Sequence, residues 1–301
     1  MTVRFGVHAG LQNTTTGELR SLWRDIEAWG FDWISIWDHF YAADLTGGAL
    51  CLEAVSMHAA LAIDTERVQC GSLVYSIGYR HPAVIANAAA TIDQLSGGRA
   101  VLGLGAGWCK PEYDAYGIPF PSPGVRLRQL DEGIQCVKAL LNDEAVDFEG
   151  EFFTMTDARC EPKPVRQPFP VWIGGGGEKV TLRIAAQHAD GWNVPFVSVE
   201  DFGRKVQVLG DHCAAVGRDP RAIKKAVNVG MAFTEEQAVE QFGAILPAVR
   251  PGLLTGSTQE MVDKIGGYVD AGADWVILAA RAPFDAEGIQ RFAEDVIPAV
   301  A

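Results

Sequence analysis

The sequence predicts an α/β protein of the (β/α)8 class, a TIM barrel formed by one domain over residues 1–301. Short apolar runs alternate with segments of helical period, and the alternation gives about eight strand–helix units. No shift in composition and no linker rich in Gly, Ser or Pro separates two halves of the chain. Continuous alternation over this length is typical of a closed parallel barrel. An open doubly wound sheet with a second domain is the competing architecture.

The first four units are regular. Each apolar run is followed by a segment whose apolar residues recur three and four positions apart, as on one face of a helix. The expected strands are residues 3–8, 31–37, 67–76 and 100–107. The expected helices are residues 19–29, 52–63, 84–95 and 125–141.

The alternation of strands and helices is interrupted between units four and five. Residues 146–160 contain a Glu-Gly turn between aromatic-rich runs, which predicts a short hairpin insertion. The alternation then resumes to the end of the chain. The expected strands are 169–174, 191–196, 224–233 and 274–280, and the expected helices are 179–188, 202–216, segments from 235 and from 258, and 287–296.

Charge and composition exclude several classes of function. The formal net charge of −13 argues against a surface for nucleic acid or anionic membrane, because both need basic patches. The six cysteines form no Cys-x-x-Cys pair, which favours reduced thiols. No secretory signal and no long apolar run is visible, so we expect a cytoplasmic protein without a membrane span.

The glycine-rich run Gly103-Leu-Gly-Ala-Gly107 resembles part of a dinucleotide-binding fingerprint. That fingerprint lies in the first strand–helix turn, with a helix directly after it. Here the run belongs to the fourth strand and is followed by Trp-Cys-Lys-Pro, so no helix is expected promptly and the fingerprint is rejected. Two interpretations remain open: close approach of a flat ligand to the main chain, or a glycine-rich corner of the barrel without a ligand.

Two other strand ends are followed by residues that could bind or react with a ligand. Asp38 and His39 follow the second strand, where the carboxylate could orient the imidazole for proton transfer near neutral pH. A hydrogen-bonded structural histidine is the alternative. Gly174–Gly177 precede a helix and are a candidate anion site, with a flexible turn as the alternative.

No metal-binding pattern of His, Cys or carboxylates and no Gly-x-Ser-x-Gly or Walker motif is present, so no metal is expected. We therefore expect an organic cofactor that is bound by its phosphate at one end and by a flat ring at the other.

Residues 79–121, 125–141 and 170–193 resemble the luciferase-like monooxygenase superfamily, particularly its coenzyme F420-dependent oxidoreductases. The similarity rests on an Arg-x-Pro from Arg80, an Asp-x-Leu-Ser-x-Gly-Arg from Asp93 and a Gly-x-Gly-x-Gly-Trp-x-x-x-Glu-Tyr from Gly103. It covers most of the chain, from about Val3 to Leu278.

The resemblance implies a TIM barrel with one flavin-type cofactor at the carboxyl ends of the strands. It implies a non-proline cis peptide at Ser72-Leu73 that supports the ring, a phosphate site at the four glycines, and His39 as a proton donor or acceptor. The implied cofactor-binding residues are Asp38, Ser72, Leu73, Tyr75, Ala106, Gly107, Gly174, Gly175, Gly176 and Gly177.

One position departs from a subgroup of the family. Members similar to the sugar-phosphate dehydrogenase carry a Glu directly after the glycine turn, whereas this sequence has Trp108, which cannot transfer a proton. We therefore do not expect sugar-phosphate activity. Trp108 suggests an apolar or planar substrate, with Trp37, Phe40 and Tyr113 as further candidate walls of the pocket.

The first functional hypothesis is an F420-dependent oxidoreductase, which transfers a hydride between the deazaflavin C5 and a small organic substrate while Asp38 and His39 manage the proton. An FMN-dependent two-component monooxygenase is the alternative, although the hairpin is the one insertion available as a shield. A non-catalytic flavin-binding barrel is the third. A homodimer is a candidate assembly because dimers are common among similar proteins.

Overall fold

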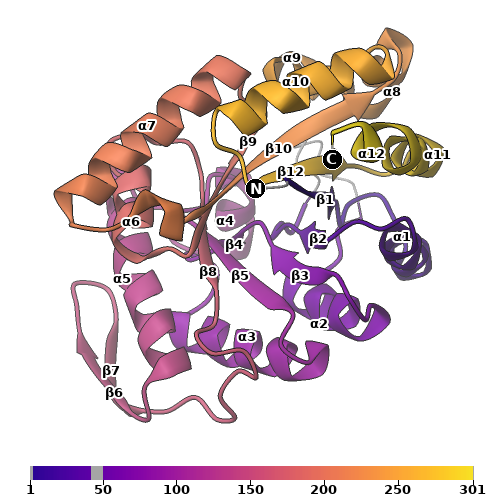
Figure 1. Ribbon diagram of the computed structural model, residues 1–301. Coiled ribbons are helices and arrows are strands. Elements are labelled where there is room, and N and C mark those ends of the chain that lie inside the picture. Colours follow the sequence, from indigo (N-terminus) through magenta and orange to yellow (C-terminus); the bar gives the residue numbers. More distant parts are fainter. Residues whose placement is uncertain (1–2, 42–49, 301) are drawn as a thin grey trace.

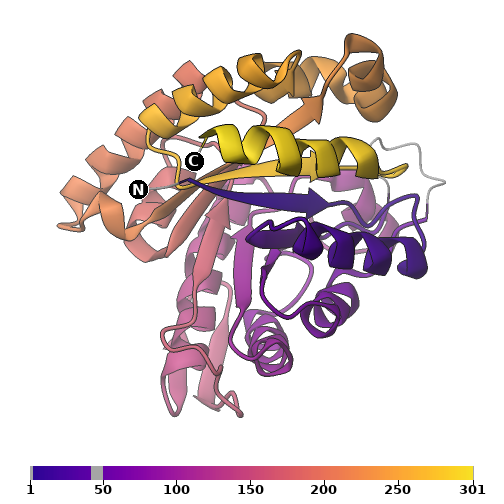
Figure 2. The same cartoon turned by 45° about the vertical axis from the view of Figure 1, so that its right-hand side comes forward.

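The computed structural model describes residues 3–41 and 50–300, which form a closed parallel barrel surrounded by helices (Figures 1 and 2). Eight strands form the ring in the order β1, β2, β3, β5, β8, β9, β10 and β12, and β12 pairs with β1 to close it. All the ladders of the ring are parallel, with helices on the outside. The predicted fold class is therefore confirmed, and the open sheet is excluded.

The expected units are present with small changes at their ends. The ring strands are β1 (Arg4–Ala9), β2 (Trp33–Ile36), β3 (Gln69–Ser72), β5 (Ala100–Gly105), β8 (Val171–Gly174), β9 (Gly191–Pro195), β10 (Lys224–Ala232) and β12 (Trp275–Ala280). The helices are α1 (Thr16–Ala28), α2 (Ala54–Asp64), α3 (Pro82–Ser96), α4 (Lys110–Tyr116), α5 (Pro123–Asn142), α6 (Thr181–His188), α7 (Val199–Ala215), α8 (Glu235–Phe242), α9 (Leu246–Val249), α10 (Thr258–Asp270), α11 (Ala286–Arg291) and α12 (Ile297–Val300).

Helix α1 illustrates how the sequence defines these units. Thr15 and Glu18 form a capping box, in which each side chain accepts a hydrogen bond from the other residue's backbone N–H. Leu19, Trp23 and Ile26 then lie on one buried face of the helix. The capping residues and the apolar periodicity therefore indicate the same helix, so α1 could be predicted from the sequence.

Three tryptophans fill the interior of the barrel near the amino ends of its strands. Trp33, Trp172 and Trp275 lie at or next to the first residues of their strands, and their rings contact one another with centroids 5.1 and 5.5 Å apart. Glycines make room for them, because a Cβ atom at Gly71 would lie 2.3 Å from the Trp33 ring and one at Gly191 would lie 2.2 Å from the Trp172 ring. The barrel is thus packed at the amino ends of its strands.

Several short elements were not expected. Helix α4 begins at Lys110, so the expectation that no helix follows Gly107 promptly is wrong; Pro111 is tolerated because it lies in the first turn. Strand β11 (Leu253–Thr255) extends the sheet beside β10, and the expected strand 67–76 is divided into β3 and β4 (Tyr75–Ser76), which pairs with β5. In contrast, the antiparallel pair of strands β6 (Val146–Glu149) and β7 (Thr154–Ala158) lies between α5 and β8, where the sequence predicts a hairpin.

Within the described residues, no helix has the length and the apolar character needed to cross a bilayer.

Candidate active site

A cavity of about 570 Å³ opens at the carboxyl ends of the strands. Every strand of the ring, or the turn after it, supplies part of its wall; examples are His8, His39, Val74, Ala106, Gly175, Asn193, Asn228 and Ala279. The segment around α9 adds an apolar side with Ile245, Ala248 and Val249. The position and the volume are those of a small-molecule site in a barrel enzyme.

The wall between β3 and β5 contains a non-proline cis peptide bond at Leu73-Val74. The position expected from the resemblance, Ser72-Leu73, is wrong by one residue. The backbone N–H of Leu73 donates to the carbonyl oxygen of Ile36 at 2.8 Å, so the Ser72-Leu73 peptide still belongs to the regular ladder with β2. The chain leaves that ladder after Leu73, and both Leu73 and Val74 line the cavity.

The glycines of β5 and β8 are required by neighbouring protein atoms. A Cβ atom at Gly105 would lie 2.5 Å from Val74 Cγ2, and one at Gly174 would lie 2.6 Å from Val74 Cγ1. A Cβ atom at Gly103 would lie 2.1 Å from the carbonyl oxygen of Ser72. The glycine run therefore lets the Leu73-Val74 segment approach the barrel wall, which neither earlier interpretation of the glycines foresaw.

Asp38 is buried and is held by cationic and backbone donors. Its carboxylate accepts two hydrogen bonds from Arg80, at 2.7 and 3.0 Å, and one from the backbone N–H of Ser76 at 3.0 Å. Burial raises the pKa of Asp38, and the hydrogen bonds from Arg80 oppose that rise. Arg80 also donates to Glu53 at 2.7 Å, so Asp38 connects the end of β2 to the starts of α2 and α3.

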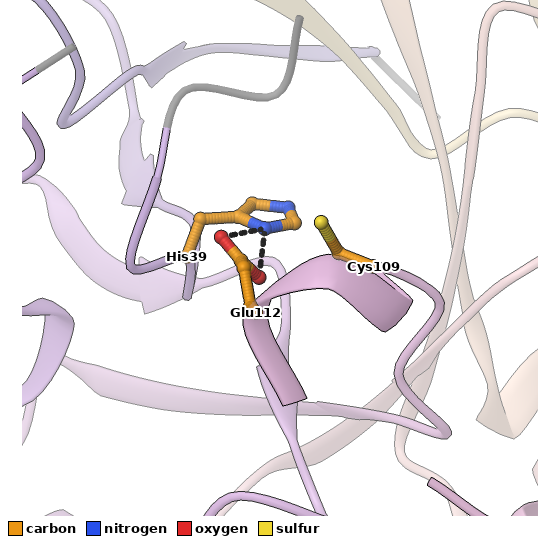
Figure 3. Close-up of side chains that lie close together, drawn as sticks. All are labelled: His39, Cys109 and Glu112. Carbon is orange, nitrogen blue, oxygen red and sulfur yellow. Dashed lines mark hydrogen bonds and ion pairs between the residues drawn. The ribbon is translucent and has the colours of Figure 1, made fainter. Parts of the chain in front are cut away.

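The carboxylate that holds His39 is that of Glu112 (Figure 3). His39 Nδ1 lies 2.9 Å from Glu112 Oε2, and the Glu112 side chain has no exposed surface. Glu112 Oε1 accepts from the backbone N–H groups of Phe40 and Tyr41 at 2.8 and 2.9 Å, and Oε2 accepts from the Tyr79 hydroxyl. Burial alone raises the pKa of Glu112, but these hydrogen bonds, led by that of His39, lower it to about 2.

This arrangement determines which nitrogen of His39 carries the proton. An ionised carboxylate only accepts hydrogen bonds, so Glu112 requires a proton on Nδ1. In the neutral ring Nε2 is then a hydrogen-bond acceptor. The expectation that Asp38 orients the imidazole is wrong, because Asp38 is engaged by Arg80 and Ser76.

Glu112 itself was missed as a functional residue. It occurs in the quoted Trp-x-x-x-Glu-Tyr motif, but that motif did not indicate that the side chain turns inward and meets a histidine 73 residues away in sequence. The signal available in the sequence was a charged residue between Pro111 and Tyr113.

Three polar residues inside the barrel wall were also missed. His8 Nδ1 lies 2.8 Å from Ser35 Oγ, and burial together with the charge of His39 lowers the pKa of His8 to about 3. Asn193 Nδ2 donates to Asn228 Oδ1 at 2.9 Å. His8, Asn193 and Asn228 each interrupt an apolar stretch of their strand, and that interruption is the signal by which they could have been found.

The four-glycine segment contributes to the wall in part. Gly174 and Gly175 line the cavity, together with Thr181 at the start of α6. Gly176 and Gly177 are not part of this wall, and the carbonyl of Gly176 accepts from Lys205 Nζ at 2.8 Å. The glycines do not open the helix directly, because α6 begins at Thr181 after a turn.

Two expected cofactor residues, Ser72 and Tyr75, have their side chains in the protein interior. Ser72 Oγ accepts from the backbone N–H of Gly103 at 3.0 Å and so ties β3 to β5. The Tyr75 hydroxyl lies 2.8 Å from His58 Nδ1, and the Tyr75 ring is fully buried. Neither lines the cavity, whereas Ala106 and Gly107 do so after β5.

Of the residues expected to form the walls of the substrate pocket, two line the cavity and two lie behind it. Trp37 and Trp108 line the cavity, and Trp108 packs edge-on against His39 with ring centroids 5.3 Å apart. Phe40 and Tyr113 do not line it. Phe40 packs on Tyr79 at 4.7 Å, and the buried ring of Tyr113 packs on Tyr79 at 4.5 Å. Both therefore support the Glu112 site from behind.

Comparisons with known proteins agree with this geometry. The sequence profile of the luciferase-like monooxygenase family matches residues 1–252. An F420-dependent glucose-6-phosphate dehydrogenase of Kineococcus radiotolerans is 28% identical over 329 residues, which cover 98% of this chain and 96% of that protein. An FMNH(2)-dependent dimethylsulfone monooxygenase of Pseudomonas putida is 28% identical over 225 residues, which cover 74% of this chain and 61% of that protein.

Among solved structures, an F420-dependent secondary alcohol dehydrogenase in complex with an F420–acetone adduct has the same fold. The TM-score is 0.90 at 22% identity, and the match covers 100% of both chains.

Proposed function

Because this chain belongs to the luciferase-like monooxygenase family of oxidoreductases, we propose that it uses coenzyme F420 to oxidise or reduce a small, neutral organic substrate. F420-dependent relatives that match nearly the whole chain support the choice of cofactor. The observation that carries the proposal is the His39 imidazole in the wall of a cavity large enough for a cofactor ring, held there by the buried carboxylate of Glu112.

The residues of the cavity fit a flat tricyclic group. Leu73 and Val74 present an apolar surface to it, and the indole Nε1 of Trp37 is a buried donor without a hydrogen-bond partner in the part of the chain that the structure describes. Leu73, Val74 and Ala106 would hold the ring, and the phosphate would bind between Gly175, which follows β8, and Thr181 at the start of α6. When bound, F420 supplies hydride transfer at C5 of its deazaflavin ring.

His39 manages the proton that accompanies the hydride. Glu112 keeps the proton of the neutral imidazole on Nδ1, so Nε2 can accept a proton from the hydroxyl of an alcohol. In the reverse direction the imidazolium donates from Nε2 to the forming alkoxide. The backbone donors of Phe40 and Tyr41 hold the carboxylate in place, so the ring orientation is set before substrate binds.

The substrate that the cavity favours is neutral. Among the described residues of its wall, Arg281 is the single Lys or Arg, and Asp38 already neutralises Arg80 nearby. Trp37 and Trp108 supply apolar surface beside His39. A sugar phosphate would be expected to require more positive charge, so we propose a different substrate from that in the names of the glucose-6-phosphate dehydrogenase relatives.

An FMN-dependent monooxygenase is the second candidate, and the dimethylsulfone monooxygenase relative favours it. A non-catalytic barrel would have no need for an imidazole held by a buried carboxylate. The first two candidates differ in the cofactor that binds and in the need for oxygen.

The test is a parallel titration of the purified protein with F420 and with FMN, followed by fluorescence. We expect tight binding of F420 and weak binding of FMN. A panel of secondary alcohols, ketones and enones is then screened for oxidation or reduction of the bound cofactor. The variant His39→Asn should retain F420 affinity and lose turnover, including the single-turnover step. Tighter binding of FMN, or wild-type rates in that variant, would overturn the proposal.

A further inference from the structure

Three donor groups of different chemistry meet beside the cavity (Figure 3). A ring nitrogen of His39, the Cys109 sulfur and a carboxylate oxygen of Glu112 all lie within 4.8 Å of one another. His39 follows β2, whereas Cys109 is the N-cap residue of α4 and Glu112 lies in the first turn of that helix. Cys109 and Glu112 are buried, so the fold holds these donors together.

We propose that His39, Cys109 and Glu112 bind a zinc ion, and that its binding blocks the proton transfer at His39. A mixed set of one nitrogen, one sulfur and one oxygen donor is characteristic of zinc, whereas magnesium and calcium require oxygen donors. Three protein ligands leave the fourth position of a tetrahedral ion for water or for a substrate oxygen. The inhibitory part of this proposal rests on the proposed role of His39 in proton transfer, in which Cys109 has no part.

The distances are close to those that a zinc ion requires. Zinc ligands lie about 2.0–2.3 Å from the ion, which places them about 3.4–3.6 Å apart in a tetrahedron. His39 Nδ1 and Glu112 Oε2 are 2.9 Å apart, and the most distant pair of the three donors lies within 4.8 Å. Side-chain movements on the order of 1 Å therefore complete the site.

Zinc binding displaces protons from the ligand atoms and changes no oxidation state. The zinc–sulfur bond forms as the S–H bond of Cys109 breaks, and that proton is released to solvent. The zinc–nitrogen bond replaces the N–H bond at Nδ1 of His39, and the ring proton moves to Nε2. Glu112 exchanges the hydrogen bond from His39 for a bond to the ion. The imidazole then presents an N–H group where it previously offered a lone pair, so it can no longer accept a proton.

Cobalt(II) is a spectroscopic probe for this site in the full chain, without F420 or substrate. We expect one ion per chain, the visible bands of tetrahedral cobalt, and a thiolate-to-cobalt charge-transfer band that zinc abolishes by displacement. Cys51→Ser is the matched control, because the Cys51 thiol is the other one next to His39, 3.0 Å from its carbonyl oxygen. Cys51→Ser should keep the charge-transfer band, and Cys109→Ser should lose it.

The affinity of Cys109→Ser for cobalt should fall about tenfold or more, since loss even of an outer-shell partner costs 10–100-fold. Cys109→Ala is the second variant, and near-ultraviolet circular dichroism checks that each variant is folded. A missing charge-transfer band in the wild type, its survival in Cys109→Ser, or its loss in Cys51→Ser would overturn the site. None of these readouts depends on the proposed F420 chemistry, so the two proposals fail separately.

The effect on His39 is measured by the ring nitrogen signals in long-range ¹H–¹⁵N NMR. Before zinc, the signals should show the proton on Nδ1. After zinc, they should show metal on Nδ1 and the proton on Nε2. An unchanged tautomer at saturating zinc would overturn the inhibitory role.

Discussion

Replacing Gly103 by Ala tests whether the glycines of β5 are required by the Leu73-Val74 segment. The added Cβ atom would lie 2.1 Å from the carbonyl oxygen of Ser72 and 2.9 Å from Val74 Cγ1. Real Cβ atoms do not approach other heavy atoms within 3.0 Å, so the backbone of β3 or β5 must move. Both strands are buried in the barrel wall, where such a shift disturbs the ladder and the cavity together.

The expected cost follows from that overlap. Overpacking of a close-packed interior costs about 1–3 kcal/mol, and contact with backbone places this variant near about 3 kcal/mol. One kcal/mol shifts the melting temperature by about 2–4 °C in domains of roughly 150–250 residues, so we expect a fall of about 6–12 °C. F420 affinity should fall as well, because Val74 faces the cavity.

The measurement is thermal and urea unfolding of Gly103→Ala beside Gly210→Ala. Gly210 lies in α7, and a Cβ atom there would meet nothing within 4 Å. Because Gly is a poor helix residue, that control should gain about 0.5–1 kcal/mol. If both variants were equally stable, the explanation of the β5 glycines by close approach would be refuted.

The remaining predictions concern the residues of the site. Glu112→Gln should offer His39 a side-chain N–H in place of the carboxylate, reverse the tautomer and lower the proton-dependent rate by about 10²–10⁴. The control Tyr79→Phe leaves the carboxylate in place and should lower that rate by about tenfold or less. Equal effects of the two variants on the rate would argue against the tautomer. Since the pKa of Glu112 falls in the folded protein from its ordinary value of 4.5 to about 2, its contribution to stability, on the order of 3 kcal/mol, should be present above pH 4.5 and disappear as the pH falls toward 2. The free energy of unfolding as a function of pH should therefore be flatter over that window in Glu112→Gln than in the wild type, and parallel curves would contradict the pKa shift. Gly175→Ala should weaken F420 binding in a fluorescence titration because its φ of +125° disfavours any side chain, and unchanged affinity would mean that the phosphate binds elsewhere.

The barrel was predictable because its signals are local and repeat. Each unit couples a buried apolar strand to a helix with one apolar face, and several helices carry capping residues, such as Thr15 and Ser257, where the sequence indicates a start. The short elements α4 and β11 were not predicted because seven residues or fewer carry too little periodicity, and the division of the expected strand 67–76 into β3 and β4 was not predicted either. Their positions depend on tertiary packing, which local pattern does not encode.

The site was predictable in its location and less so in its contacts. The strand ends identified Asp38 and His39 correctly as neighbours of the cavity. Adjacency in sequence nevertheless suggested that these two residues act together, whereas the fold turns them toward different partners, Arg80 and Glu112. Tyr75 was expected in the cavity from the family resemblance, but its ring lies in the interior.

The contacts of Asp38 and Glu112 are compatible with the anionic cofactor that we propose for this acidic chain. The formal net charge is −13, so the field of the whole protein opposes an anion. Asp38 is paired with Arg80, and the charge of Glu112 is spread over four hydrogen-bond donors, two of them backbone N–H groups. Neither carboxylate therefore presents an uncompensated charge to the cavity. The same contacts separate their tasks, because Asp38 fixes Arg80 and the turns around it while Glu112 fixes the imidazole of His39.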